Sequence, residues 1–411
     1  MDDVTAPPRG HLVTVVGVGA DGSLQPAAET LLQEADVVLG GRRHLDLVAP
    51  VPGQERRPWP SPLAPSLPAL LDELRGRRVV ALASGDPMVS GIGTTLVRAL
   101  GAEAVLVIPA VSSVALARAR MRWSAEESVV VTLVGRHEAR VLREVAPGQR
   151  ILVLTSGSQT VASVGRLLTE AGHPDAVITL LGNLGTDTES RYTKTAQEWA
   201  ATAVDTVPPL HVLAIEIPAG ASAWRSSWVA GLPDEAFEND GQLTKRDLRA
   251  SALARLSPAP GQHLWDVGAG AGSIGIEWMR AHPTCRTTAV EADSERAARV
   301  ARNATRLGVP DLRVVEGRAP DALAGLEPPH AIFIGGGATR PGVLDACLAA
   351  LRPGGRLVVH GVTLETESLL AEAYRTHGGE LTRLAVETTH PVGTFTGWTP
   401  LRTVTQWSLR L

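Results

Sequence analysis

The stretch that decides the fold of the C-terminal half is Leu264-Trp265-Asp266-Val267-Gly268-Ala269-Gly270-Ala271-Gly272-Ser273-Ile274-Gly275-Ile276-Glu277-Trp278. It begins as a short apolar strand that ends in Asp266, continues with glycine at every second position, and then starts a helix. Glycine permits positive φ and a close approach of the backbone to a ligand, and a helix N-terminus offers free N–H groups. Such a unit can hold a nucleotide-like cofactor at the carboxyl end of a parallel strand.

The order Asp-x-Gly-x-Gly-x-Gly resembles the first motif of class I methyltransferases, which bind S-adenosylmethionine. The resemblance implies an acidic residue at the end of the next strand to accept hydrogen bonds from the ribose hydroxyls, and Glu291 supplies it. It also implies an adenine contact at Ala319, with Glu316 pointing away. Another nucleotide fold stays open, because Gly270 to Gly275 also fits the Gly-x-Gly-x-x-Gly fingerprint of dehydrogenases.

Length and composition set the broad class of the protein. A chain of 411 residues predicts two or three domains at about 150 residues each. With 44% hydrophobic residues and a formal net charge of −4, we expect a soluble protein with no bulk attraction to nucleic acid or to a membrane. Only Cys285 and Cys347 are present and the histidines lack metal-ligand spacing, which argues against disulfides and metal clusters. The acidic start and the lack of a long apolar run predict a cytoplasmic location.

Apolar runs alternate with helical stretches along the chain, which predicts an α/β protein with mainly parallel sheets. We expect a first domain over residues 10–218 and a compact second domain over 239–411. The intervening 219–238, rich in proline, glycine, serine and acidic residues, predicts a linker. The proline-rich segment 51–68 predicts a surface loop, and two β-type runs near the C-terminus predict a closing antiparallel hairpin.

The N-terminal half carries its own glycine-rich blocks. Val15 to Gly22 follows the first predicted strand, and Ala83 to Gly91 and Pro109 to Ala117 each follow a strand and open a helix. Small and hydroxyl residues at strand ends let backbone amides and serine hydroxyls reach a polar ligand. Each block alone is equally typical of a tight turn with a helix cap. The three in order favour a binding site.

That order resembles the tetrapyrrole methylases, a fold of two α/β subdomains that also uses S-adenosylmethionine. The resemblance runs from about His11 to Pro218, and its specific parts are Ser84-Gly85-Asp86-Pro87 and Pro109-Ala110-Val111-Ser112-Ser113. One departure is Val134, which stands where relatives often have histidine. The resemblance implies cofactor contacts at Asp86, Met88, Gly91, Ser112 and Ser113.

The pairing of this fold with a C-terminal, Rossmann-like class I methyltransferase of seven strands is similar to the bifunctional, decarboxylating precorrin methyltransferases of cobalamin biosynthesis. The segment Asp240 to Arg249 also matches that family. The resemblance implies methylation of carbon 5 in the N-terminal domain, and methylation of carbon 15 with loss of the ring C acetate carboxyl in the C-terminal domain. It implies two S-adenosylmethionine sites per chain, with Asp266 organising the second turn and C-terminal contacts at Thr244, Gly268, Ala269, Gly270, Ala271, Gly272, Glu291 and Ala319.

A precorrin carries many acetate and propionate groups, which arginine and lysine bind well. Only two of the 39 basic residues are lysine, which singles out Lys245. Solvated surface charge is the alternative for each arginine. The candidates are Lys245, Arg246 and Arg249 in the C-terminal half and Arg42, Arg43 and Arg136 in the N-terminal half. Separately, His360 at the end of a predicted strand is a weaker candidate on the cofactor side. No general base is predicted, because electron-rich meso carbons attack the methyl group in line once they are positioned.

Three other functions stay open. A nucleic-acid methyltransferase is disfavoured by the acidic net charge and the lack of a basic stripe. A non-catalytic sensor would keep at most one working cofactor site. No residue in the sequence distinguishes an enzyme that acts on cobalt-containing precorrins from one that acts on metal-free precorrins. We expect no nucleic-acid or membrane partner, and the family resemblance implies a homo-oligomer.

Overall fold

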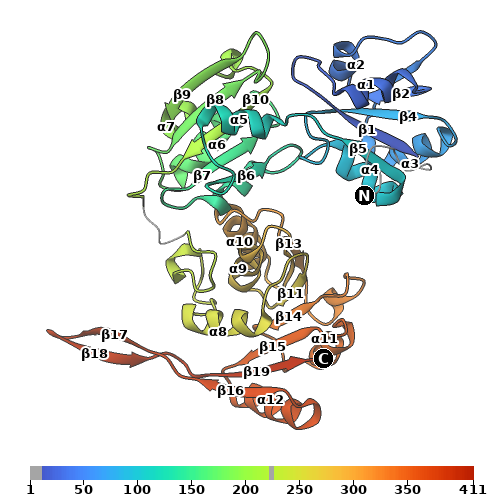
Figure 1. Cartoon of the computed structure of the whole chain (residues 1–411). Helices are drawn as coiled ribbons and strands as arrows, with labels where there is room; N and C mark the ends of the chain where they lie inside the picture. The colour runs from blue at the N-terminus through green and yellow to red at the C-terminus, as the bar shows by residue number, and fades with distance from the viewer. Residues whose placement is uncertain (1–11, 222–225) are drawn as a thin grey trace, which may run out of the picture. The chain divides into compact units, whose positions relative to one another are not determined.

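The computed structural model describes residues 12–221 and 226–411 (Figure 1). Residues 10 and 11 of the predicted first domain and 222–225 of the predicted linker lie outside this part. The described chain forms two compact units. The first comprises residues 12–136, 150–169 and 174–216, and the second comprises 137–149, 170–173 and the described residues from 217 to 411.

The first sheet is fully parallel, with strand order β3-β2-β4-β1-β5. Alternate residues of its strands pack into two apolar clusters, one on each face, so both faces are buried as parallel sheets require. The predicted loop 51–68 is wrong in part, since a polar edge strand and the start of a helix fall within it. The elements are β1 (Val13–Val18), α1 (Pro26–Gln33), β2 (Val37–Gly40), α2 (Arg42–Leu47), β3 (Glu55–Pro58), α3 (Leu63–Glu73), β4 (Val79–Ser84), α4 (Ile92–Leu100), η1 (Ala102–Ala104) and β5 (Val105–Ile108).

The second sheet, with order β6-β7-β10-β8-β9, is mixed. Strand β10 is antiparallel to both of its neighbours, and β8 is antiparallel to β9. The prediction of mainly parallel sheets is therefore wrong here, because a buried apolar run does not encode strand direction. The elements are α5 (Ser113–Met121), β6 (Ser128–Thr132), β7 (Arg150–Leu154), α6 (Thr160–Glu170), β8 (Val177–Gly182), β9 (Ser190–Thr195), α7 (Ala196–Ala200), η3 (Val204–Thr206) and β10 (His211–Glu216). The short helix η2 (Glu138–Glu144) belongs to the second unit.

The third sheet has the predicted seven strands, in the order β13-β12-β11-β14-β15-β19-β16. The first five strands in this order, from β13 through β12, β11 and β14 to β15, are parallel. Strand β19 runs antiparallel to both of its neighbours. The elements are η4 (Asp234–Ala236), α8 (Arg246–Leu256), β11 (His263–Val267), α9 (Ser273–Ala281), β12 (Arg286–Glu291), α10 (Ser294–Arg306), β13 (Arg313–Glu316), η5 (Asp321–Leu323), β14 (Ala331–Ile334), α11 (Val343–Ala350), β15 (Arg356–Gly361), α12 (Leu364–His377), β16 (Glu380–Leu384), β17 (Glu387–Val392), β18 (Phe395–Pro400) and β19 (Val404–Arg410).

The predicted closing hairpin is divided into two parts. Strands β16 and β19 complete the main sheet, whereas β17 and β18 pair only with each other and run out from it as a separate ribbon (Figure 1). Among the residues described, no helix combines the length and apolarity needed to cross a membrane.

The predicted linker 219–238 is too long. Leu232, Ala236 and Phe237 are buried in the same apolar cluster as Trp278 and Phe333 of the second unit. Because proline, glycine and acidic residues surround these positions, the apolar residues show no helical or strand periodicity in the sequence. The compact second unit therefore includes chain before residue 239.

Candidate cofactor and substrate pockets

The second unit contains a cavity of about 740 Å³ at the carboxyl ends of its parallel strands. Its floor is the glycine turn after β11, and the ends of β12 and β14 and the segment after β13 complete it. Strand β11 lies between β12 and β14, so the strand order of the sheet reverses at β11. A crevice forms at the carboxyl ends of the strands at this point. Open α/β sheets bind ligands at this kind of point.

The turn requires glycine at two positions that line this cavity. Gly268 has φ of 69° and Gly270 has φ of 58°, in the left-handed region that side chains disfavour. A Cβ atom on Gly268 would lie 2.8 Å from the Gly336 carbonyl oxygen, and one on Gly270 would lie 2.8 Å from the Gln242 oxygen. Three segments therefore approach so closely that only bare backbone fits between them.

Two carboxylates hold the turn in place. Asp266 Oδ2 accepts a hydrogen bond from the Gly275 amide at 3.0 Å, the organising role expected for it. Burial raises the pKa of Asp266 to about 7. Glu291 Oε2 accepts from the Gly270 amide at 2.8 Å, while Oε1 accepts from the Asp293 amide at 3.0 Å. The Glu291 carboxylate thus faces both the turn and the cavity.

Most of the sequence-predicted contacts are brought together in this cavity. Two are not: Ala271 is buried and its carbonyl accepts from Asn303 Nδ2 at 3.0 Å, and Gly272 lies against Val300. Glu316 is also outside the lining, as expected. The predicted residues that line the cavity are Thr244, Lys245, Gly268, Ala269, Gly270, Glu291 and Ala319.

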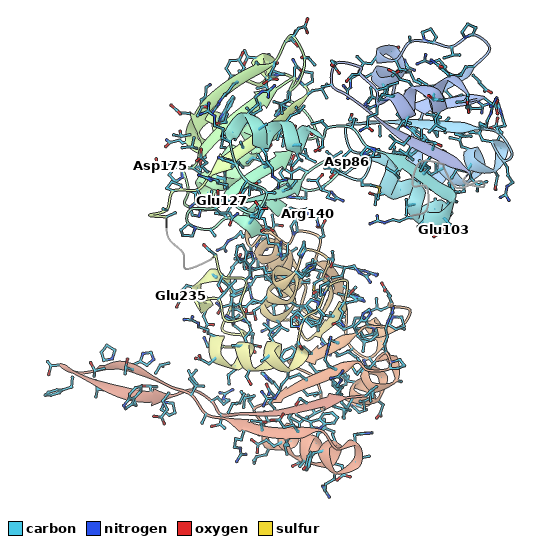
Figure 2. All side chains as sticks on the ribbon, in the orientation of Figure 1. Asp86, Glu103, Glu127, Arg140, Asp175 and Glu235 are labelled. Carbon is cyan, nitrogen blue, oxygen red and sulfur yellow. The ribbon has the colours of Figure 1, made fainter. Side chains whose placement is uncertain are left out.

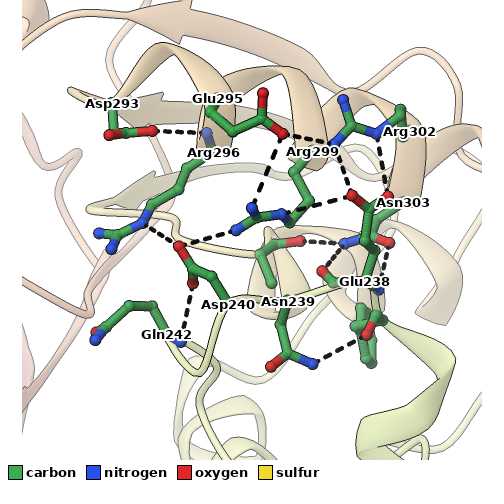
Figure 3. A network of polar contacts seen from close by, with 12 residues as sticks. Glu238, Asn239, Asp240, Gln242, Asp293, Glu295, Arg296, Arg299, Arg302 and Asn303 are labelled. Atoms are coloured by element: carbon green, nitrogen blue, oxygen red, sulfur yellow. Dashed lines mark hydrogen bonds and ion pairs between the residues drawn. The ribbon is translucent and has the colours of Figure 1, made fainter.

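A network of ion pairs anchors the segment of residues 238–242, whose last two residues, Gly241 and Gln242, line the cavity (Figure 3). Asp240 Oδ2 lies 2.9 Å from Arg296 Nε and 3.0 Å from Arg299 Nη1, both on α10. Glu238 Oε1 pairs with Arg302 Nη2 at 2.7 Å. The segment that leads into Thr244 is therefore fixed to the helix after Glu291.

Arg249 is not positioned to bind substrate, contrary to the sequence-based expectation. Its side chain is 0% exposed, and Nε donates to Glu277 Oε1 at 2.6 Å. The other guanidinium nitrogens donate to the Thr244 and Leu232 carbonyls. Arg249 thus supports the wall residue Thr244 from inside the core. Arg246 is exposed and lies outside the cavity lining.

Sequence reasoning missed most of the positive charge around this cavity. Lys245, Arg296, Arg318, Arg340 and Arg402 line it, from segments far apart in the chain. Arg296 is paired with Asp240, and Lys245 Nζ lies 3.4 Å from Asp234 Oδ2. The other three arginines form no ion pair with any residue in the described part of the chain. No local sequence signal distinguishes them from surface arginines.

His360 also lines the cavity, at the end of β15. The Gln406 amide nitrogen donates to its Nε2 at 2.9 Å, and the Gln406 oxygen accepts from Arg255 Nε at 3.0 Å. Burial lowers the pKa of His360 to about 4. The imidazole is therefore neutral near pH 7.

The first unit has a cavity of about 490 Å³ lined by residues of both its sheets. Asp86 lies on the side of the first sheet that faces the second (Figure 2). Three further predicted residues, Gly91, Ser112 and Ser113, line it too. Met88 does not, and its side chain is 46% exposed.

Of the predicted cations in this unit, Arg43 lines the cavity and Arg42 and Arg136 do not. Val134, the departure from the family pattern, is also in the lining. Within the described residues, no group of three or more histidine, cysteine or acidic side chains is arranged to hold a metal ion.

Comparisons with known proteins agree with this architecture. Residues 12–200 match the family of tetrapyrrole (corrin/porphyrin) methylases, and residues 235–411 match the precorrin methyltransferase domain. A precorrin-6Y C(5,15)-methyltransferase [decarboxylating] of Sinorhizobium sp is 44% identical over 398 residues, covering 96% of this chain and 95% of that protein. One of Mycobacterium tuberculosis (strain H37Rv) is 42% identical over 401 residues, covering 97% and 99%.

Shorter proteins are similar to part of the chain. A probable cobalt-precorrin-6B C(15)-methyltransferase (decarboxylating) of Pyrobaculum calidifontis is 35% identical over 181 residues, covering 42% of this chain and 92% of that protein. The crystal structure of the C-terminal domain of a Rhodobacter capsulatus precorrin-6Y C5,15-methyltransferase is 41% identical, with a TM-score of 0.43. It covers 45% of this chain and 100% of its own.

Proposed function

The chain belongs to the precorrin-6Y C(5,15)-methyltransferase (decarboxylating) family, and from that premise we propose that its two cavities are two separate methyl-donor sites. The enzyme is a C-methyltransferase of cobalamin biosynthesis that uses S-adenosylmethionine. The second-unit cavity methylates carbon 15 and removes the carboxyl group of the ring C acetate. The first-unit cavity methylates carbon 5.

The division of labour is supported by the shorter relative, whose name carries only C(15) methylation and decarboxylation. These two reactions therefore occur together in a protein less than half as long as this chain. We assign them to the second unit, because residues 235–411 match the precorrin methyltransferase domain and the similarity to the shorter relative spans 181 residues, about the length of that domain.

The residues of the second cavity fit a methyl donor. The backbone at Gly268 and Gly270 leaves no room for a Cβ, and Glu291 offers a carboxylate at the end of β12 to accept from ribose hydroxyls. Thr244, Ala269 and Ala319 complete the wall. S-adenosylmethionine supplies a sulfonium methyl group that a nucleophilic carbon attacks in line, with the thioether sulfur of S-adenosylhomocysteine as the leaving group.

The observation that carries the substrate proposal is the set of arginines in the same cavity that form no ion pair within the described part of the chain. Arg318, Arg340 and Arg402 face a ligand together with Lys245, while the carboxylates of the lining are Asp266 and Glu291. Guanidinium groups bind carboxylates in bidentate fashion, so the cavity suits a polycarboxylate. These contacts orient the macrocycle, and orientation supplies much of the rate enhancement.

The reaction requires the protein to position the macrocycle relative to the methyl group rather than to activate it with a general base. Each methyl transfer forms a carbon–carbon bond, breaks the sulfur–methyl bond and releases one proton from the macrocycle. Decarboxylation leaves an electron pair that the conjugated ring accepts, and the acetate carbon then takes up one proton. His360 is neutral and buried beside the cavity, where an N–H on Nδ1 orients the ligand without adding charge.

Binding stoichiometry tests the two-site proposal. We expect two S-adenosylhomocysteine molecules per chain by calorimetry, and one after Gly270→Ala. Gly261→Ala is the matched control, because Gly261 also has positive φ but lies in open space outside the cavity. One site in the unaltered chain, or two in Gly270→Ala, would contradict the proposal.

Product analysis tests the reaction. With a metal-free precorrin the full chain should add two methyl groups and release one carbon dioxide, as followed by mass spectrometry. A faster reaction with the cobalt-containing precorrin would instead favour the anaerobic version of the pathway. Robust methylation of bulk RNA would refute the tetrapyrrole assignment. A cytoplasmic location and a homo-oligomer stay predictions that the family resemblance and the sequence support.

A further inference from the structure

Three polar side chains meet on the wall of the first-unit cavity. Arg43 and His44 come from α2, and Ser84 ends β4. Arg43 Nη2 donates to Ser84 Oγ at 2.8 Å and to His44 Nε2 at 3.0 Å. Ser84 Oγ also lies 2.7 Å from His44 Nε2. The three atoms form a closed triangle, which fixes one edge of the guanidinium.

The triangle does not neutralise Arg43. Arginine has donors only, so His44 Nε2 acts as an acceptor and the imidazole proton is on Nδ1. Burial and the neighbouring Arg43 charge lower the pKa of His44 to about 4, so the ring is uncharged near pH 7. A serine and a neutral histidine therefore hold a full positive charge in place.

Arg43 also lacks an acidic partner. Within the described residues, no aspartate or glutamate forms an ion pair with it, and burial lowers the pKa of its guanidinium. Asp86 is the acidic residue in the cavity lining, and its Oδ1 accepts from the Met88 amide at 2.8 Å. Among the described lining residues, Arg43 is the single arginine or lysine. Its Nε and Nη1 donors remain available for an anion.

We infer that Arg43 is the carboxylate anchor of the first-unit cavity, and that His44 and Ser84 are positioning residues that aim it at one acetate or propionate group of the tetrapyrrole. The inference rests on the proposed function of this cavity. Several arginine and lysine side chains line the second-unit cavity, whereas Arg43 is the one such side chain among the described residues that line the first-unit cavity. A pinned guanidinium loses less freedom on binding than a mobile one, so a single anchor suffices for orientation.

The test uses the full chain with Arg43→Gln, and Arg42→Gln as its matched control. Arg42 is the preceding residue on the same helix and is exposed like Arg43, but it does not line the cavity. We expect Arg43→Gln to raise the KM for carbon 5 methylation about 10- to 100-fold, the range for a charge-assisted hydrogen bond. Carbon 15 methylation and decarboxylation should be unchanged, which shows that the second unit folds, and retained S-adenosylhomocysteine binding at the first-unit cavity shows that the first unit folds.

His44→Phe and Ser84→Ala test the positioning role. Each should raise the same KM less than Arg43→Gln does, and neither should add to the effect of Arg43→Gln in a double variant. Additive effects would refute a role that acts through Arg43, because a purely structural contribution persists when Arg43 is absent.

Calorimetry distinguishes the two sources of a carboxylate, since S-adenosylmethionine also carries one. Unchanged affinity for S-adenosylhomocysteine in Arg43→Gln supports the tetrapyrrole, and a fall of 10-fold or more would overturn that assignment. An unchanged KM in Arg43→Gln would overturn the inference while leaving the proposed function intact. If the unaltered chain fails to methylate carbon 5, the proposed function fails and the inference with it.

Discussion

The buried Arg249–Glu277 pair gives the sharpest stability prediction. The Arg249 side chain is 0% exposed and Glu277 is 3% exposed, at 2.6 Å. Glu277 also accepts from the Gly231 and Leu232 amides at 2.6 and 3.0 Å. The pair therefore fastens the chain before Thr244 to α9. Arg249→Met keeps much of the side-chain volume and removes the charge.

The expected cost follows from what remains behind. Glu277 is left as a buried carboxylate without its cation, and the Leu232 and Thr244 carbonyls lose their donors. Removing one partner of a buried pair costs about 3–5 kcal/mol of unfolding free energy. For a domain of this size each kcal/mol lowers Tm by roughly 2–4 °C, so Arg249→Met should lower it by about 6–20 °C.

Calorimetric melting of the full chain measures this, with the transition of the second unit followed separately because we expect a chain of two compact units to unfold in more than one step. Arg246→Met is the control, since Arg246 is exposed on the same helix and should change stability by no more than about 0.5 kcal/mol. Adding Glu277→Gln to Arg249→Met should recover part of the loss, because the unpaired charge disappears.

One result would refute this reasoning. If Arg249→Met weakens precorrin binding while the Tm of the second unit falls by less than about 2 °C, equivalent to about 1 kcal/mol, then Arg249 is a substrate ligand. That is the role that the sequence alone predicted for it. Loss of stability together with weaker binding of S-adenosylhomocysteine is compatible with the structure, because the Arg249 guanidinium supports the Thr244 carbonyl at the cavity wall.

Three further predictions address the two cavities. Glu291→Gln should weaken S-adenosylhomocysteine binding at the second-unit site by about 10- to 100-fold, since Glu291 accepts from the Gly270 amide and faces the cavity, and calorimetry should show the first-unit site unaltered. Burial raises the pKa of Asp266 from 3.8 to about 7, so between these values the folded state holds the extra proton and the unfolding free energy falls as pH rises. Asp266→Asn should flatten that dependence when the melting of the second unit is followed from about pH 4 to 7, and an unchanged slope would contradict it. Gly17→Ala should destabilise the first unit by about 3 kcal/mol, measured by urea unfolding, because its Cβ would lie 1.9 Å from the Gly85 oxygen and 2.5 Å from the Ala110 nitrogen; a loss below about 1 kcal/mol would show that these segments separate easily.

The sequence predicted both glycine-rich turns because the residues that form each turn are adjacent in the chain. A strand end, a glycine turn and a helix start are adjacent in the chain, so Gly268, Gly270 and Asp86 are recognisable in place. Even here the glycine motif includes residues that do not line the cavity. Ala271 and Gly272 belong to the same motif, yet the helix that begins at Ser273 carries them away from the cavity.

Strand direction and domain limits were less accessible. An apolar run such as β10 has the same sequence pattern in a parallel and an antiparallel sheet. Burial on both faces removes the alternation of apolar and polar residues. The segment around Leu232 and Phe237 has a linker composition, and only its packing against Trp278 shows that it belongs to a core.

By itself the sequence determined the fold class, the presence of a glycine-rich turn in each half and the family, because these depend on residues adjacent in the chain. Only the tertiary structure decided the role of each charge. Arg249 is buried in the core, and Arg43 lies on a cavity wall without an acidic partner among the described residues. Arg318, Arg340 and Arg402 are brought from separate loops to one site. All are the same residue type, and what distinguishes them is burial and partner, which long-range packing sets.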